Sequence, residues 1–118
     1  MQKLFIFIVL VGIFIVYTAF VYTSGTQCAV SNPKAVEGKQ IYQKYNCQAC
    51  HQLYGLGGYL GPELTILTSP KGKGELYAKA ILKTGTERMP NFHLQDNEID
   101  DLVEFFKYVN ETAITYKK

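Results

Sequence analysis

One segment near the amino terminus restricts the fold of this chain more than any other feature. Residues 4–22 contain no charged side chain and only weak polar breaks. Coiled as an α-helix with a rise of about 1.5 Å per residue, this run would span roughly 28 Å, close to the hydrocarbon thickness of a bilayer. The run therefore predicts a single transmembrane helix.

A cleaved signal peptide, or a lipoprotein signal ending at Cys28, is the alternative interpretation of the same run. The apolar part of a signal peptide is usually about 7–15 residues long and ends at a small-x-small site. The residues after Tyr22 offer no such site, and Gln27 stands where lipidation requires a small residue. An uncleaved anchor is therefore the favoured interpretation.

The apolar run also predicts how the chain is divided. We expect a transmembrane anchor over residues 1–22, a linker over residues 23–32 and one domain over residues 33–118. Lys3 and the terminal amine precede the run, so the positive-inside rule places the amino terminus in the cytoplasm and the domain on the outer face.

Charge beyond the anchor is balanced but unevenly spread. With Lys3 set aside, 11 of the 12 Lys and Arg and all 10 Asp and Glu follow the apolar run, which does not favour nucleic acid as a partner. Solvated helix faces are the favoured interpretation of the local clusters, and a docking surface for a redox partner is the alternative. The clusters are Lys71, Lys73, Lys79 and Lys83, followed by Asp96, Glu98, Asp100, Asp101 and Glu104.

Three further helices are expected after the linker. Asn32 and Pro33 are typical of a helix start, and this helix should end near Asn46. The glycines between Gln52 and Pro70 favour an extended loop. A short helix should run from residue 74 or 75 to about residue 83 and stop at Gly85, and a last helix should begin at residue 95 or 96. The inward positions expected are Val36, Gln40, Ile41 and Tyr45, then Leu76, Ala80 and Ile81, then Ile99, Leu102, Val103, Phe106 and Val109.

Such short helices provide little apolar core, so a bound group should fill the centre of the domain. Cys47-Gln48-Ala49-Cys50-His51 is a C-x-x-C-H motif, the pattern for covalent attachment of haem c. Two thiols on one tight turn can form thioethers with the two vinyl groups of one haem, and the adjacent histidine can bind the iron. We expect one covalent haem c, held by Cys47 and Cys50, with His51 as an iron ligand.

Two other uses of the cysteines are disfavoured. A thiol–disulfide C-x-x-C motif would follow a strand in a β-α-β unit, which the sequence does not predict. A zinc site would need a fourth ligand, and Cys28 and His93 lie far away along the chain. Cys28 therefore has no assigned role.

A second iron ligand is expected from the segment before the last helix. Met89 lies in a turn that Pro90 stiffens, where its thioether can fold over the haem. The alternative role for a single methionine is to fill space in the apolar core. Met89 is preferred as the ligand, and His93 and an exchangeable position are the alternatives.

The segments YNCQACH, GPELT, MPNF and DNEIDDLVEFFKYV resemble a class I c-type cytochrome over residues 33–113. This resemblance implies an all-α class I cytochrome c fold, with three to four short helices around one haem c, after the transmembrane helix. It also implies that the carbonyl of Pro62 accepts a hydrogen bond from His51. The first and last helices should cross closely at Gly38 and Phe105 or Phe106.

Residues 50–65 are similar to the segment C-H-x-L-x-G-x-G-x-Y-x-x-P-x-L-T of the membrane-anchored cytochrome c subunit of bacterial nitric oxide reductase. The chain looks shorter than that subunit between residues 65 and 89. This resemblance implies an electron-transfer subunit without catalysis of its own, in the bacterial inner membrane with its haem domain in the periplasm. A soluble cytochrome c, a cupredoxin or a quinol-linked donor would supply electrons, and a haem b-containing membrane subunit would receive them.

Several alternatives remain open. A subunit of a haem–copper oxygen reductase shares much of the pattern, and a tethered shuttle would serve several complexes. The linker reaches about 33 Å at most, which favours a fixed subunit. A haem-based sensor would require an output domain, which we do not expect here. Tyr54 and Tyr59 should pack against the haem edge or the partner, and Arg88 is either a propionate partner or a solvated residue.

Overall fold

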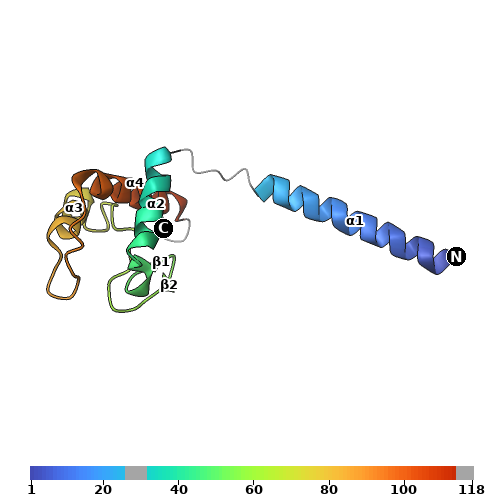
Figure 1. The fold of residues 1–118 in the computed structure, drawn as a ribbon, viewed down its shortest axis with the longest axis horizontal. Helices are drawn as coiled ribbons and strands as arrows, with labels where there is room; N and C mark the ends of the chain where they lie inside the picture. Colours follow the sequence, from blue (N-terminus) through green and yellow to red (C-terminus); the bar gives the residue numbers. More distant parts are fainter. Residues whose placement is uncertain (26–31, 114–118) are drawn as a thin grey trace. The chain divides into compact units, whose positions relative to one another are not determined.

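The computed structural model describes residues 1–25 and 32–113, which belong to two compact units, Met1–Ser31 and Asn32–Lys118 (Figure 1). The first unit contains α1 (Gln2–Gly25), a helix long and apolar enough to cross a membrane. The hydroxyl of Thr18 donates to the carbonyl of Phe14 at 2.7 Å, so this polar group is satisfied within the helix. The helix ends three residues beyond the anchor predicted from the sequence.

The second unit is mostly helical, which confirms the predicted all-α class. Its elements are α2 (Pro33–Lys44), the 3₁₀-helix η1 (Cys47–Ala49), strands β1 (Gln52–Leu53) and β2 (Leu56–Gly57), α3 (Glu75–Thr84) and α4 (Asp96–Thr112). The prediction of an extended loop without regular structure was wrong at β1 and β2. These strands pair antiparallel, with Gln52 opposite Gly57 and Leu53 opposite Leu56.

The start of α2 matches its prediction. The side chain of Asn32 accepts a hydrogen bond from the N–H of Lys34 at 3.1 Å, and Pro33 is the first helical residue. The predicted buried side was wrong at Val36 and Gln40, which are exposed, and confirmed at Ile41, which is buried, and at Tyr45, which is partly buried against the core. The side that packs consists of Ala35, Gly38, Ile41 and Tyr42.

The close crossing of α2 and α4 explains this difference. A Cβ atom on Gly38 would overlap the backbone carbonyl of Asp101 and crowd the Cβ of Phe105. The glycine therefore lets the two backbones touch, as the resemblance implied, and Phe105 is the aromatic partner at that point. Figure 1 shows α4 running across α2 and reaching α3 with its amino-terminal part.

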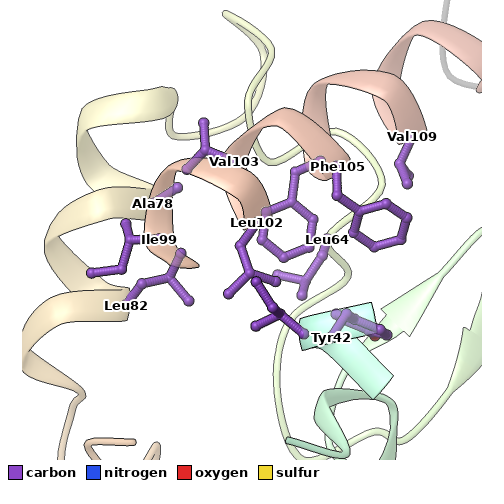
Figure 2. Packing of buried hydrophobic residues seen from close by; sticks show 11 residues of the cluster. Tyr42, Leu64, Ala78, Leu82, Ile99, Leu102, Val103, Phe105 and Val109 are labelled. Atoms are coloured by element: carbon purple, nitrogen blue, oxygen red, sulfur yellow. The ribbon is translucent and has the colours of Figure 1, made fainter. Parts of the chain in front are cut away.

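An apolar cluster joins the three helices of this unit. Figure 2 shows Ala78 and Leu82 of α3 facing Ile99 of α4, while Tyr42 of α2 lies near Leu64. The prediction for α4 is confirmed, since Ile99, Leu102, Val103, Phe106 and Val109 are all buried.

The predicted buried side of α3 was wrong. Leu76 is 85% exposed and Ala80 is exposed, whereas Ala78 and Leu82 are buried. The stop at Gly85 is confirmed, because its N–H donates to the carbonyl of Ile81 at 2.8 Å and its φ of 69° lies in the left-handed region.

Ion pairs fasten α3 to α4 on the exposed side. Lys79 contacts Asp100 at 2.8 Å, and Lys83 contacts Asp96 at 2.8 Å. Lys107 of α4 contacts Glu75 of α3 at 2.9 Å. Lys79 and Lys83 of the basic cluster therefore contact the acidic start of α4.

Candidate haem site

The C-x-x-C-H motif forms a tight turn directly after α2. Asn46 takes a left-handed conformation with φ 51°, which turns the chain out of α2 and into η1. The N–H of His51 donates to the carbonyl of Cys47 at 2.9 Å, which closes one turn around the motif. Cys47 is partly buried against the apolar cluster, while Cys50 is exposed, and both thiols are free.

Residues 57–64, here called the strap, fold back along the motif. Three backbone N–H groups of the strap donate to carbonyls at the motif. These bonds run from Gly58 to Gln48 at 2.9 Å, from Gly61 to Cys50 at 2.7 Å and from Leu64 to Gln52 at 2.9 Å. The strap therefore holds the motif along its whole length.

Glycines make this close contact possible. A Cβ on Gly57 would overlap the carbonyl of His51, and one on Gly58 would overlap the carbonyl of Ala49. A Cβ on Gly61 would overlap the imidazole ring of His51. The sequence prediction treated these glycines as signs of a loop, whereas three of them are needed for close packing against the motif.

The imidazole of His51 has one nitrogen committed to the strap. Its Nδ1 lies 2.8 Å from the carbonyl oxygen of Pro62. A carbonyl can only accept a hydrogen bond, so Nδ1 carries a proton and donates, which leaves the other ring nitrogen, Nε2, outside this contact. This is the hydrogen bond that the resemblance implied, and it leaves Nε2 as the nitrogen able to bind iron.

Residues 85–91, here called the methionine turn, carry the predicted second ligand. The N–H of Met89 donates to the hydroxyl of Thr86 at 3.0 Å, and the N–H of Thr86 donates to the carbonyl of Met89 at 2.8 Å. Met89 is partly buried against the apolar cluster. His93 is exposed in a left-handed conformation with φ 52°. The burial of Met89 therefore favours Met89 over His93 as the second iron ligand.

The motif and the methionine turn border the same apolar cluster. Six partly buried side chains pack against it: Tyr45, Cys47, Leu53, Leu67, Met89 and Leu94. The donor set on this side consists of two thiols on one turn, an imidazole whose Nδ1 is held by the strap, and a thioether. Thioether formation and His/Met axial ligation require these groups, so the residues fit haem c.

Tyr42 supplies a second sign of a bound group. Its side chain is 4% exposed, and its hydroxyl is the one buried side-chain polar atom without a hydrogen-bond partner in the described part of the chain. Burial, followed by the negative charges of Cys47 and Glu63, raises the pKa of Tyr42 to about 12. Burial also raises the pKa of the Cys47 thiol. The region next to the attachment cysteine is therefore apolar and poorly hydrated.

Among the described residues, no metal cluster competes with the predicted haem site. In residues 1–25 and 32–113, no group of three or more His, Cys, Asp or Glu side chains could hold a metal ion. A surface groove of about 410 Å³ contains none of the predicted site residues. Its lining is polar and comes from α2 and α4: Glu37, Gln40, Ile41, Lys44, Asn97, Glu98 and Asp101.

All three predicted contact residues are exposed, and one of them, Tyr54, contacts α4. Tyr59 is 85% exposed, and Arg88 is exposed without an ion pair or hydrogen bond to any described residue. The hydroxyl of Tyr54 contacts Thr112 at 2.6 Å and donates to the carbonyl of Val109 at 3.2 Å, so Tyr54 fastens the hairpin to α4. Cys28 lies outside the described residues.

Two polar residues of the strap region were missed by the sequence reasoning. Glu63 and Thr65 hydrogen-bond each other and the turn between β1 and β2. The only signal was the GPELT segment, in which only Pro62 received a role. Thr65 is completely buried, which a polar residue in a glycine-rich loop did not suggest.

A comparison with protein families identifies the domain. Residues 33–106 match the family model described as cytochrome c oxidase, cbb3-type, subunit III. The chain belongs to this family of cytochrome c domains. Membership supports the fold assigned above and implies haem c as the group that the motif holds.

Curated relatives point to one kind of complex. The C subunit of the nitric oxide reductase of Stutzerimonas stutzeri is 28% identical over 118 residues, covering 92% of this chain and 80% of the relative. Its counterpart in Cereibacter sphaeroides is 28% identical, covering 76% of this chain and 69% of the relative. That of Paracoccus denitrificans is 33% identical, covering 62% and 57%. The chain is therefore similar to cytochrome c subunits of nitric oxide reductase.

Proposed function

We propose that this chain is a membrane-anchored monohaem cytochrome c that relays single electrons to a haem b-containing catalytic membrane subunit of a nitric oxide reductase. The observation that carries the proposal is the 2.8 Å contact between Nδ1 of His51 and the carbonyl of Pro62. This contact sets the tautomer that an axial ligand needs, directly beside two thiols with the spacing for covalent attachment.

Each residue has a separate task in this proposal. Cys47 and Cys50 would form the two thioether bonds, and His51 would bind the iron through Nε2. Met89 would supply its thioether as the second iron ligand. When bound, haem c supplies an iron that gains and loses one electron.

The same residues support relay without bond chemistry. If both His51 and Met89 bind the iron, a substrate would find no coordination position on it. In the proposed complex, reduction of nitric oxide to nitrous oxide and water takes place in the partner subunit. A soluble cytochrome c, a cupredoxin or a quinol-linked protein would donate the electrons.

The length of the connection supports a fixed subunit over a shuttle. The described helix α1 ends at Gly25 and the described domain begins at Asn32. Six residues in between can span at most about 20 Å, less than the predicted linker could. A domain on so short a connection would stay near the membrane, with α1 as the anchor and the haem domain on the periplasmic face.

One observation favours a second candidate. The matching family model is named for a subunit of an oxygen-reducing oxidase, so an oxygen reductase is the alternative partner. The relay by His51 and Met89 would be the same in either complex. Four relatives that carry the name of nitric oxide reductase make that reductase the preferred partner.

Gentle solubilisation of native membranes, followed by purification through a carboxyl-terminal tag, tests the proposal. We expect haem c together with haem b, and electron-dependent consumption of NO that far exceeds consumption of O2. Consumption of O2 instead would assign the chain to an oxygen reductase. Haem c without any co-purifying subunit would refute the fixed-subunit assignment, and a preparation without covalent haem would refute the cytochrome itself.

A further inference from the structure

We propose that Glu63 and Thr65 are positioning residues that set the orientation of the His51 imidazole through the carbonyl of Pro62. The inference rests on the proposed haem site and adds to it a device that controls the histidine ligand. The carbonyl of Pro62 belongs to the planar peptide that joins Pro62 to Glu63, so its orientation depends on where Glu63 is held.

Hydrogen bonds of Glu63 and Thr65, here called the clasp, connect the segment after Pro62 to the turn after His51. The hydroxyl of Thr65 donates to Oε1 of Glu63 and accepts the N–H of Tyr54 at 2.6 Å. The other carboxylate oxygen of Glu63, Oε2, accepts the N–H of Gly55 at 3.1 Å. Two side chains just after Pro62 thus hold two successive backbone N–H groups just after His51.

The turn that the clasp holds would not be stable alone. Tyr54 has φ 55° and Gly55 has φ 77°, and a left-handed conformation is unfavourable for a tyrosine. The clasp satisfies both N–H groups of this turn, while the Tyr54 hydroxyl fastens it to α4. The turn is therefore a fixed point from which Glu63 can hold the adjacent carbonyl of Pro62.

Burial makes the clasp sensitive to small changes. Thr65 is 0% exposed, so removal of its hydroxyl would leave the N–H of Tyr54 without its acceptor away from water. The turn would then move, and the peptide joining Pro62 to Glu63 would move with it. The hydrogen bond from Nδ1 of His51 would lengthen, and the imidazole would become a weaker electron donor to a bound metal.

The reduction potential distinguishes a role in orienting the His51 imidazole from a role that only stabilises the fold. A weaker donor histidine favours the reduced iron, so Thr65→Val should raise the midpoint potential of the intact membrane protein. We expect the ratio of reduced to oxidised haem at a fixed potential to rise about threefold, which is about 28 mV at 59 mV per tenfold change. The proton resonance of the His51 Nδ1–H should shift in the same variant.

Two matched variants control the experiment. Thr65→Ser keeps the hydroxyl and should restore the wild-type potential. Thr68→Val makes the same substitution three residues further on, where the hydroxyl donates to the carbonyl of Phe106 at 3.4 Å, outside the clasp. Thr68→Val should lower thermal stability without moving the potential or the Nδ1–H resonance.

The possible results separate this inference from the proposed function. An unchanged potential in Thr65→Val, or equal shifts in Thr65→Val and Thr68→Val, would overturn the positioning role while the cytochrome stands. Where Thr65→Val does not mature, Thr65→Ala takes its place, since it removes the same hydroxyl without changing any charge, and the same rise is expected. Wild-type protein without covalent haem would overturn the proposed function and this inference together.

Discussion

The two sides of the proposed haem site are built very differently. On the histidine side, three backbone hydrogen bonds, the Pro62 carbonyl and the Glu63–Thr65 clasp surround His51. Glycines bring the strap into direct contact with the imidazole ring. This ligand is held by the polypeptide itself.

On the methionine side, far fewer bonds hold the ligand. The turn that carries Met89 is closed by two hydrogen bonds with Thr86, and Arg88 and Pro90 around it are exposed. The difference indicates that His51 is fixed before it binds iron, whereas Met89 depends more on the iron bond itself. Exchange of ligands should therefore occur on the methionine side.

Gly61→Ala tests the histidine side with the largest expected effect. The new methyl group would overlap the His51 ring, and overpacking of this kind costs about 1–3 kcal/mol. Covalent cytochrome should fall to a small fraction of the wild-type amount, measured as haem stain per immunodetected chain after denaturing electrophoresis. Gly12→Ala, where nothing lies within 4 Å, should mature normally. Normal maturation of Gly61→Ala would show that the strap is not rigid.

Met89→Leu tests the opposite side. Haem should remain attached, because both thioethers and His51 are untouched, but the midpoint potential should fall by on the order of 100 mV. Carbon monoxide should bind the reduced protein, seen as a shifted absorption spectrum. His93→Ala should leave both properties unchanged. A wild-type spectrum in Met89→Leu, together with a changed one in His93→Ala, would assign the ligand to His93.

The sequence predicted features that depend on neighbours along the chain. The Asn32 cap, the stop at Gly85 and the buried side of α4 follow from local hydrogen bonding and helical spacing, and the structure confirms them. The C-x-x-C-H motif is local as well, so the sequence alone was enough to predict Cys47, Cys50 and His51 as residues of a haem site.

Residue spacing did not predict features that depend on contacts between distant segments, and the two that were predicted, the crossing at Gly38 and the bond from His51 to Pro62, came only from the family resemblance. The buried side of α2 is set by the approach of α4 at Gly38, and two-residue strands are too short to show a period. The clasp exists only because the fold brings Tyr54 to Thr65. Spacing along the chain carries no information about such a contact.

Tyr42→Phe tests whether the region around Tyr42 and Cys47 is shielded from water. The pKa of Tyr42 is raised to about 12 from 10.0, so the unfolded chain loses this proton first as the pH rises. Below pH 10 the raised pKa of Tyr42 contributes at most about 2.7 kcal/mol to the free energy of unfolding. This contribution disappears as the pH rises from 10 to 12. Thioether formation removes the Cys47 charge and lowers this limit, while burial remains. The free energy of unfolding should therefore decrease less from pH 10 to 12 in Tyr42→Phe; equal decreases would show a hydrated hydroxyl.

Thr86→Val tests the weaker side with the smallest expected effect. The substitution removes the acceptor of the Met89 N–H but leaves the backbone bond from Thr86 to the Met89 carbonyl. Because the bond is exposed, its loss should cost about 0.5–1 kcal/mol. Added imidazole, which competes with Met89 for the iron, should then bind about two- to fivefold more tightly in an absorbance titration.

Thr18→Val is the matched control for this titration. Its hydroxyl donates to the carbonyl of Phe14 at 2.7 Å within α1, so its loss should not affect imidazole binding. If Thr86→Val also leaves imidazole binding unchanged, the polypeptide does not hold Met89 through this turn, and the iron bond alone keeps the methionine in place. The contrast between the two sides would then be larger than the hydrogen bonds indicate, because His51 would be the only ligand that the fold itself positions.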